Sequence, residues 1–182
     1  VSKLIQEEML AEIDFSNIPN YKYIGEAYKN LSSDPENKYS VPYFWGTVVV
    51  IYNAVYVAPE DVKDKSLDLL WNEKYAGKIL MFDNPRDAFA IAEIMLGYSL
   101  NTENEEEMRA ASAKLLSQKK IVQAYVMDEV FNKMESGNAA IAPYYAGDYF
   151  TMYASNEDLA FAYPKEGSNV FVDAMCIPKC SQ

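Results

Sequence analysis

Apolar and polar positions alternate between strand-like and helix-like patterns along most of the chain. Residues 1–40 are a polar lead-in whose first eleven positions have helical spacing, and a continuous apolar run over 41–53 predicts a strand buried on both faces. Further strands are predicted over 78–82, 121–126, 139–145, 159–163 and 170–177. Helices are predicted over 66–71, 84–96, 102–118, 129–136 and 147–154. This order predicts an α/β fold with a mostly parallel central sheet flanked by helices.

One helix has especially clear start and stop signals. Asn84 is the expected N-cap, Pro85 takes the first helical position and Asp87 the third, and Gly97 is the expected stop. The side chains expected to face inward are Phe89, Ala92 and Leu96.

Two other helix starts are predicted from the same kind of signal. Thr102 and Glu105 form a capping-box pattern, and Asp148 is the expected N-cap of the helix that follows Gly147.

Three strand-to-loop junctions carry polar and aromatic side chains, at 83–87, 144–148 and 171–173. Ligands bind outside the carboxyl ends of the strands in open α/β sheets, so these junctions are candidate site segments. Asp87 also has a purely structural explanation as a helix-start residue. Of Tyr144 and Tyr145, alternation of strand faces predicts that one points into a cleft and the other into packing.

The last predicted strand places Phe171 and Asp173 on one face. An aromatic ring beside a carboxylate suits a cation with an apolar body, because the ring attracts the charge and the carboxylate pairs with it. A solvated carboxylate next to a core ring is the alternative. The opposite face is expected to be buried and holds Val170, Val172, Ala174 and Cys176.

Charge and composition narrow the function classes. The chain has 182 residues, a formal net charge of −11 and no histidine. The acidic balance disfavours nucleic acid as a partner, and the absence of histidine removes the usual general base and the commonest metal ligand. We expect no enzyme, no catalytic residue, no metal site and no cofactor. Cys176 and Cys180 are expected to be thiols, with a disulfide as the alternative.

The apolar runs are all too short to span a membrane as a helix. No signal peptide is visible and the first residue is Val1, so we expect an excised or processed piece of a longer protein.

Several segments together resemble the periplasmic polyamine-binding proteins of spermidine/putrescine ABC transporters. Residues 39–47 resemble the family pattern Y-S-[IV]-P-Y-x-W-G-[AT], and residues 163–178 resemble [WY]-P-x-E-G-x-x-x-[WF]-x-D-x-[LM]-x-[IV]-P. Shorter matches in the same order lie at 66–78, 82–89, 96–101 and 145–148.

The resemblance implies the two-lobed binding-protein fold of the second type. Residues 1–40 would be a remnant of the first lobe, and residues 41–182 the second lobe with hinge strands at about 41–53 and 170–177. Relatives of this kind have about ninety more residues before this segment and a further part after it, so the chain is expected to hold about half of the site.

The resemblance also implies the ligand contacts. Asp87 takes the place of an acid that pairs with an amine, Tyr145 that of a cleft aromatic, Phe171 that of a stacking Trp, and Asp173 that of an acid that holds an ammonium. Further candidates are Asn84, Trp45 and Tyr144. Because Asn84 is neutral where some relatives have an acid, a diamine is favoured over a triamine.

The partners implied are a polyamine and the membrane permease of an ABC transporter, at a periplasmic or extracellular location with a lipid anchor or fused segment outside this chain. The alternatives are a binding protein for another organic cation or a metal ion, and a ligand-sensing effector domain of the same fold.

Overall fold

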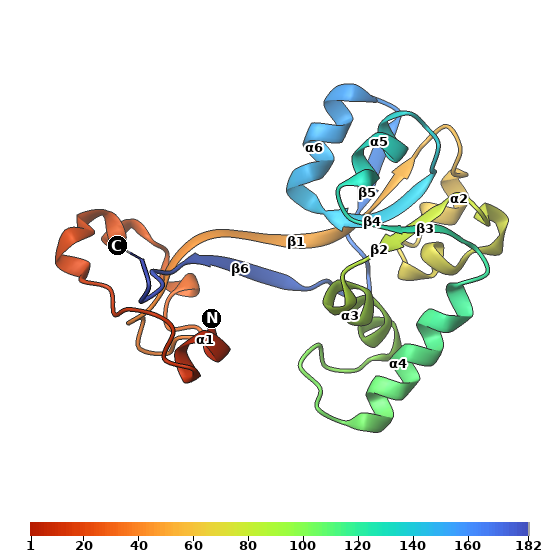
Figure 1. Ribbon diagram of the computed structural model, residues 1–182. Coiled ribbons are helices and arrows are strands. Elements are labelled where there is room, and N and C mark those ends of the chain that lie inside the picture. Colours follow the sequence, from red (N-terminus) through yellow and green to blue (C-terminus); the bar gives the residue numbers. More distant parts are fainter. Residues whose placement is uncertain (182) are drawn as a thin grey trace. The chain divides into compact units, whose positions relative to one another are not determined.

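The chain forms two compact units, seen here in a computed structural model that describes residues 1–181 (Figure 1). Unit 1 consists of residues 1–46 and the chain from Val170 onward, and unit 2 consists of residues 47–169. The division expected at residue 40, with hinge strands at about 41–53 and 170–177, stays a prediction.

Unit 2 holds most of the regular structure, in the expected alternation. Its strands are β2 (Ile79–Phe82), β3 (Val122–Val126), β4 (Ile141–Tyr145) and β5 (Leu159–Ala162), joined by most of β1 (Val41–Asn53). Its α-helices are α2 (Pro59–Val62), α3 (Pro85–Leu96), α4 (Glu105–Gln118), α5 (Glu129–Glu135) and α6 (Ala146–Ser155). Two 3-10 helices, η4 (Leu67–Trp71) and η5 (Glu73–Tyr75), precede β2.

Unit 1 is built mainly from turns. It contains α1 (Ser2–Gln6), the 3-10 helices η1 (Phe15–Asn17), η2 (Pro19–Tyr23) and η3 (Glu26–Tyr28), and β6 (Val170–Met175), which pairs with β1.

The sheet is mixed, so the expectation of a mostly parallel sheet is only partly confirmed. The strand order is β3-β2-β4-β1-β5; β2 is parallel to β3 and β4, whereas β1 is antiparallel to β4 and β5. An apolar run indicates that a strand is buried on both faces, but it does not indicate whether the neighbouring strand is parallel or antiparallel. For this reason the sequence did not predict the antiparallel pairs of β1. In β1, positions 41–42, 48–51 and 53 are buried, whereas 43–45 are exposed.

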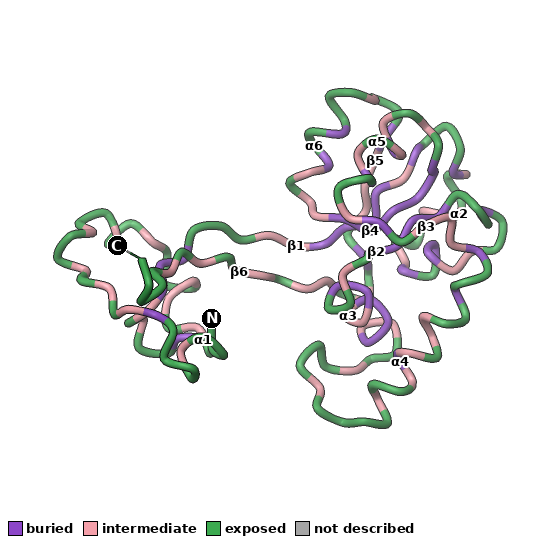
Figure 2. Tube along the Cα trace, in the orientation of Figure 1, coloured by how far each residue is buried: buried purple, intermediate pink, exposed green. Residues whose placement is uncertain are grey.

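The hydrophobic core of unit 2 lies along its central strands, which are drawn as buried in Figure 2. Figure 1 shows α5 and α6 on one side of these strands and α3 and α4 on the other. The largest fully buried side chains include Phe82, Ile141 and Met152. This covered sheet gives unit 2 a rigid frame for the side chains at its strand ends.

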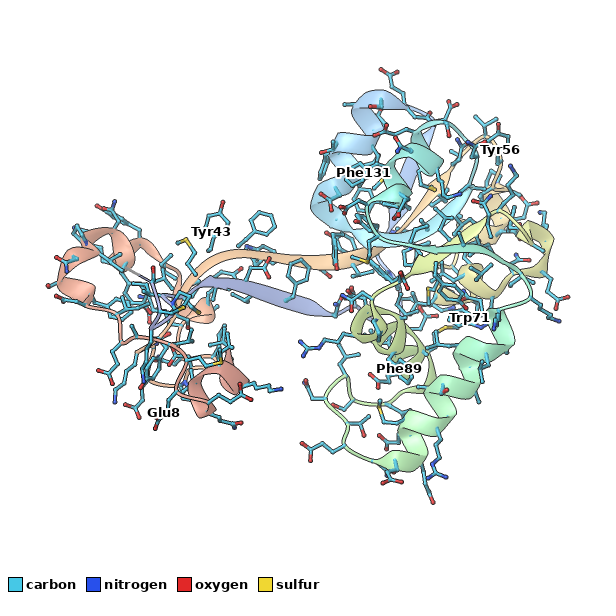
Figure 3. All side chains as sticks on the ribbon, in the orientation of Figure 1. Glu8, Tyr43, Tyr56, Trp71, Phe89 and Phe131 are labelled. Carbon is cyan, nitrogen blue, oxygen red and sulfur yellow. The ribbon has the colours of Figure 1, made fainter. Side chains whose placement is uncertain are left out.

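Helix α3 begins and ends as predicted, but its inward face is different. Asn84 accepts a hydrogen bond from the backbone N–H of Arg86, and Gly97 is left-handed at φ 75°. The buried positions are Asp87, Ala88, Ile91, Ala92 and Glu93. Phe89, labelled on α3 in Figure 3, is only half-buried, and Leu96 is exposed. The prediction of an inward position was therefore wrong for two of the three side chains.

Two other predicted helix starts are displaced. The N-cap of α4 is Asn104, not Thr102, and the N-cap position of α6 is Tyr145, not Asp148. At α4, Thr102 and Asn104 are both capping residues and the structure uses Asn104. At α6 the helix begins without a side-chain cap, so Asp148 lies inside its first turn.

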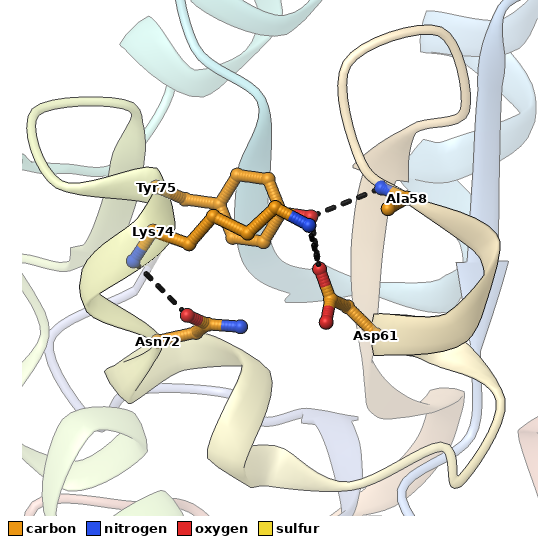
Figure 4. Close-up of polar contacts among 5 residues, drawn as sticks. All are labelled: Ala58, Asp61, Asn72, Lys74 and Tyr75. Atoms are coloured by element: carbon orange, nitrogen blue, oxygen red, sulfur yellow. Dashed lines mark hydrogen bonds and ion pairs between the residues drawn. The ribbon is translucent and has the colours of Figure 1, made fainter.

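Polar contacts fasten the segment between β1 and β2 (Figure 4). The hydroxyl of the buried Tyr75 accepts from the backbone N–H of Ala58 and donates to Asp61, whose carboxylate also pairs with Lys74 at 2.7 Å. Hydrogen bonds from Lys74 and then Tyr75 lower the pKa of Asp61. This cluster connects α2 to η5, and its opposite charges pair with each other.

Strand β6 does not have the buried face that alternation predicted. Val170 is 67% exposed, and Val172, Ala174 and Cys176 are only half-buried. Cys176 and Cys180 are free thiols, as expected.

Candidate functional site

The centre of the candidate site is Asp87, on the first turn of α3. Its side chain is buried, at 8% exposure. The Nδ2 of Asn84 donates to its Oδ2 at 2.7 Å, and the hydroxyl of Tyr145 donates to the same oxygen at 2.8 Å. The Nδ2 of Asn169 donates to Oδ1 at 3.3 Å. These donors are all neutral, so they orient the carboxylate without cancelling its charge.

Asn84 does two things at this helix start. Its Oδ1 caps α3 by accepting from Arg86 N–H at 3.1 Å, while its Nδ2 reaches Asp87. The amide suits both bonds because it has an acceptor on one side and a donor on the other. The same residue that begins the helix therefore also holds the central carboxylate.

Tyr144 and Tyr145, at the end of β4, differ in burial and in partners, although their rings lie 4.9 Å apart and both contact Phe82, so they do not face opposite ways as alternation of strand faces predicted. Tyr144 is buried and stacks on Phe82 with ring centroids 5.5 Å apart. Tyr145 is half-buried and reaches Asp87. The structure therefore brings Tyr145 into the Asp87 cluster, whereas Tyr144 packs in the core.

Both phenols are harder to ionise than an ordinary tyrosine. Burial raises the pKa of Tyr144 to about 12, with the charge of Asp128 adding to the effect. Burial, followed by the hydrogen bond to Asp87, raises the pKa of Tyr145 above its usual range. Tyr145 is therefore a hydrogen-bond donor to Asp87 at any physiological pH.

Asn169 is the member of this cluster that the sequence did not reveal. It lies in the loop between Gly167 and β6, with no periodic pattern and no cap signal around it. Only the tertiary fold brings it to Asp87, which is 82 residues away along the chain.

Phe171, Asp173 and Trp45 belong to unit 1. The Phe171 ring occupies the space beside Gly46, where a Cβ atom would lie 2.9 Å from Cε1 and closer still to Cζ. Asp173 is exposed. Trp45 stacks on Tyr28 at 5.8 Å between centroids and is 52% exposed. Their roles in ligand binding stay predictions, as do those of Asn84, Asp87, Tyr144 and Tyr145.

Residues 1–181 contain no group of three or more His, Cys, Asp or Glu side chains placed to hold a metal ion. Over the same residues, every helix falls short of the length or the apolar character needed to cross a membrane.

Comparison with known proteins places the chain among solute-binding proteins. The bacterial extracellular solute-binding protein family matches residues 1–182. The spermidine/putrescine-binding periplasmic protein of Escherichia coli (strain K12) is 32% identical over 178 residues, which is 98% of this chain and 51% of that protein.

Solved structures give the same result. A putative spermidine/putrescine ABC transporter protein from Listeria monocytogenes has a TM-score of 0.88 and 38% identity, over all of this chain and 55% of that one. The spermidine/putrescine ABC transporter substrate-binding protein PotD from Streptococcus pneumoniae has a TM-score of 0.83 and 36% identity, over all of this chain and 55% of that one. The chain thus spans about half the length of these relatives.

The fold is that of periplasmic binding proteins, as expected from the resemblance. With its whole length matched, the chain belongs to the family of bacterial extracellular solute-binding proteins.

Proposed function

We propose that this chain is part of the substrate-binding component of an ABC importer and that it binds a polyamine of the putrescine or spermidine class. The observation that carries the proposal is the state of Asp87. It is a buried carboxylate with neutral hydrogen-bond donors, and within residues 1–181 it forms no ion pair.

A buried carboxylate without a cationic partner is costly, by about several kcal/mol for full burial. The neutral donors offset part of that cost, and a ligand cation would offset more. A protonated amine supplies both a positive charge and N–H donors, so it meets the chemical requirement of this group.

The names of the relatives favour polyamines over the alternatives. The matched proteins include ones named for spermidine and putrescine and, in Pseudomonas aeruginosa, for putrescine. We infer that Asp87 pairs with one ammonium group, that the Tyr145 ring covers part of the methylene chain, and that Phe171 and Asp173 supply a second ring and a second carboxylate.

The remaining roles follow from this one. The chain binds and releases its ligand without turnover, and its partner is the permease of the importer. Its place is outside the cytoplasmic membrane, held there by a lipid anchor or a fused segment.

Calorimetry with putrescine and spermidine tests the proposal, using the full natural polypeptide that carries this chain. Micromolar binding, which corresponds to about −8 kcal/mol, is expected for at least one of the two. Asp87→Asn and Asp173→Ala should each weaken binding about tenfold or more, because each removes one charge-assisted contact.

Asp158→Asn is the matched control, since Asp158 is an exposed carboxylate just before β5. It should leave the dissociation constant unchanged within about twofold. No heat with either polyamine, together with heat from another organic cation in the same protein, would replace the polyamine proposal with that alternative.

A further inference from the structure

Asn169 is the last residue of unit 2 and connects three parts of it. Its Nδ2 donates to Oδ1 of Asp87 at 3.3 Å, and its Oδ1 accepts from the backbone N–H of Val48 at 3.3 Å. Val48 is the second residue of unit 2 after the chain enters it along β1. One amide thus links the carboxylate of α3 to both points where the chain crosses between the units.

The two oxygens of Asp87 are in different states. Oδ2 accepts two hydrogen bonds, at 2.7 Å and 2.8 Å. Oδ1 accepts a single longer bond, from Asn169. A carboxylate oxygen has two lone-pair sites, so Oδ2 is filled and Oδ1 has room for one more donor. Oδ1 is therefore the oxygen that can accept a further hydrogen bond, such as one from a ligand ammonium.

The direction of Oδ1 depends on Asn169. The terminal torsion of an aspartate is broad, so two donors on Oδ2 leave the carboxylate free to swing about that oxygen. A donor on Oδ1 removes this freedom. Because Asn169 is itself held by the backbone of β1 at Val48, the reference point is the sheet and not another mobile side chain.

We propose that Asn169 is a positioning residue of the polyamine site, which fixes Oδ1 of Asp87 for the ligand ammonium by anchoring it to β1. This inference rests on the proposed function. It adds a residue that acts through Asp87 and makes no ligand contact of its own.

Ser168 provides a matched comparison. Its hydroxyl donates to the carbonyl oxygen of Val48 at 2.5 Å and accepts from the hydroxyl of Thr47 at 2.8 Å. Like Asn169, it therefore connects the two segments, near Val48 and near residue 169, where the chain passes between the units. Asp87 is not among its hydrogen-bond partners within the described chain. Ser168→Ala removes the crossing contact and keeps the carboxylate contact.

The test measures putrescine binding by calorimetry with the full natural polypeptide. Asn169→Ala should weaken binding about tenfold, whereas Ser168→Ala should change it less than twofold. In the Asp87→Asn background, the effect of Asn169→Ala should fall below twofold, because an amide at position 87 no longer presents a charged oxygen to fix.

A purely structural role for Asn169 predicts the opposite pattern. It gives the same loss of affinity in both backgrounds, or similar losses for Asn169→Ala and Ser168→Ala. Either result overturns the proposal, as does a wild-type affinity in Asn169→Ala.

A ligand-free arm separates this inference from the proposed function. Urea midpoints are measured for Asn169→Ala, Asp87→Ala and the double variant. A double variant less destabilised than the sum of the single variants shows that the two side chains interact without ligand, and additive shifts overturn the inference. If the wild-type protein shows no binding of putrescine or spermidine by calorimetry, the proposed function is overturned instead.

Discussion

At the scale of single residues, Gly46 and Phe171 share one space. The Phe171 ring lies where a side chain at position 46 would begin, so the absence of a Cβ atom at Gly46 is what admits the ring. The φ of Gly46 lies outside the left-handed region, so the constraint is one of volume and not of backbone conformation. This gives a physical reason for glycine after Trp45.

Gly46→Ala should displace the Phe171 ring and weaken polyamine binding by about five- to tenfold, since overpacking forces a side chain out of its preferred rotamer at about 1–3 kcal/mol. Calorimetry with putrescine measures the effect, and near-ultraviolet circular dichroism reports the ring.

Gly25→Ala is the control for that change, because an added Cβ would meet only the Tyr28 ring, at an ordinary 3.5 Å. If both variants bind like the wild type, the contact of Phe171 with Gly46 has no bearing on the ligand.

At the scale of elements, α3 carries a second buried acid besides Asp87, the residue that we propose binds the ligand. Glu93 is 4% exposed and lies about 1.7 turns after Asp87. Burial, and then the charge of Glu107 on α4, raises the pKa of Glu93. Glu107 is itself held by the hydroxyl of Thr102. The contact between α3 and α4 therefore contains an acid that favours its protonated form.

The pKa of Glu93 is raised on folding. Its contribution to the free energy of unfolding is therefore fully present at low pH and is lost as the pH rises through the raised pKa. Glu93→Gln should therefore raise Tm by about 2–4 °C at pH 7, with a gain that shrinks as the pH falls to about 4. Thermal unfolding of both proteins between pH 4 and pH 8 measures this.

Glu103→Gln, at an exposed position just before α4, should show no such pH-dependent gain. A gain for Glu93→Gln that stays constant with pH would mean that ionisation of Glu93 has no part in it.

The start of α3 also bears on ligand choice. Asn84→Asp keeps an acceptor for the Arg86 N–H but replaces the donor to Asp87 with a second negative charge. More negative charge favours the ligand with more ammonium groups, so the spermidine-to-putrescine affinity ratio should rise about fivefold, or about 1 kcal/mol. Competition calorimetry measures the ratio.

Asn84→Ala removes the cap and the donor without adding charge, so it should weaken both ligands alike and lower stability by about 1 kcal/mol. An unchanged ratio in Asn84→Asp would refute the view that the neutral amide favours a diamine.

Local signals in the sequence predicted elements well and their pairing poorly. The bounds of α3 could be read from Asn84, Pro85 and Gly97 because capping chemistry is local. The inward face of α3 could not, since the buried side of a helix is set by what packs on it. Asp87 and Tyr145 were candidates because they lie at strand ends and match family motifs, whereas Asn169 contacts Asp87 only through the tertiary fold.

At the scale of the whole molecule, the residues implied in ligand binding are divided between the units. Asn84, Asp87 and Tyr145 are in unit 2, which has a continuous core, and Phe171 and Asp173 are in unit 1. Unit 1 exposes large aromatic side chains, among them Tyr43, labelled on β1 in Figure 3, at 72%. The chain also spans about half the length of its relatives. A full set of ligand contacts is therefore expected only in a longer polypeptide.

This chain alone should bind a polyamine far more weakly than the full natural polypeptide does. An ion pair in contact with water is worth about 1 kcal/mol or less, and Asp173 is exposed in this chain. The chain alone should therefore bind putrescine with a dissociation constant of about 1 mM or weaker, against the micromolar range for the full polypeptide. Calorimetry under identical conditions measures the difference, and far-ultraviolet circular dichroism checks that both proteins are folded. Micromolar binding by the folded chain alone would mean that residues 1–182 contain a complete site, in which Asp87, with its neutral donors, supplies most of the affinity.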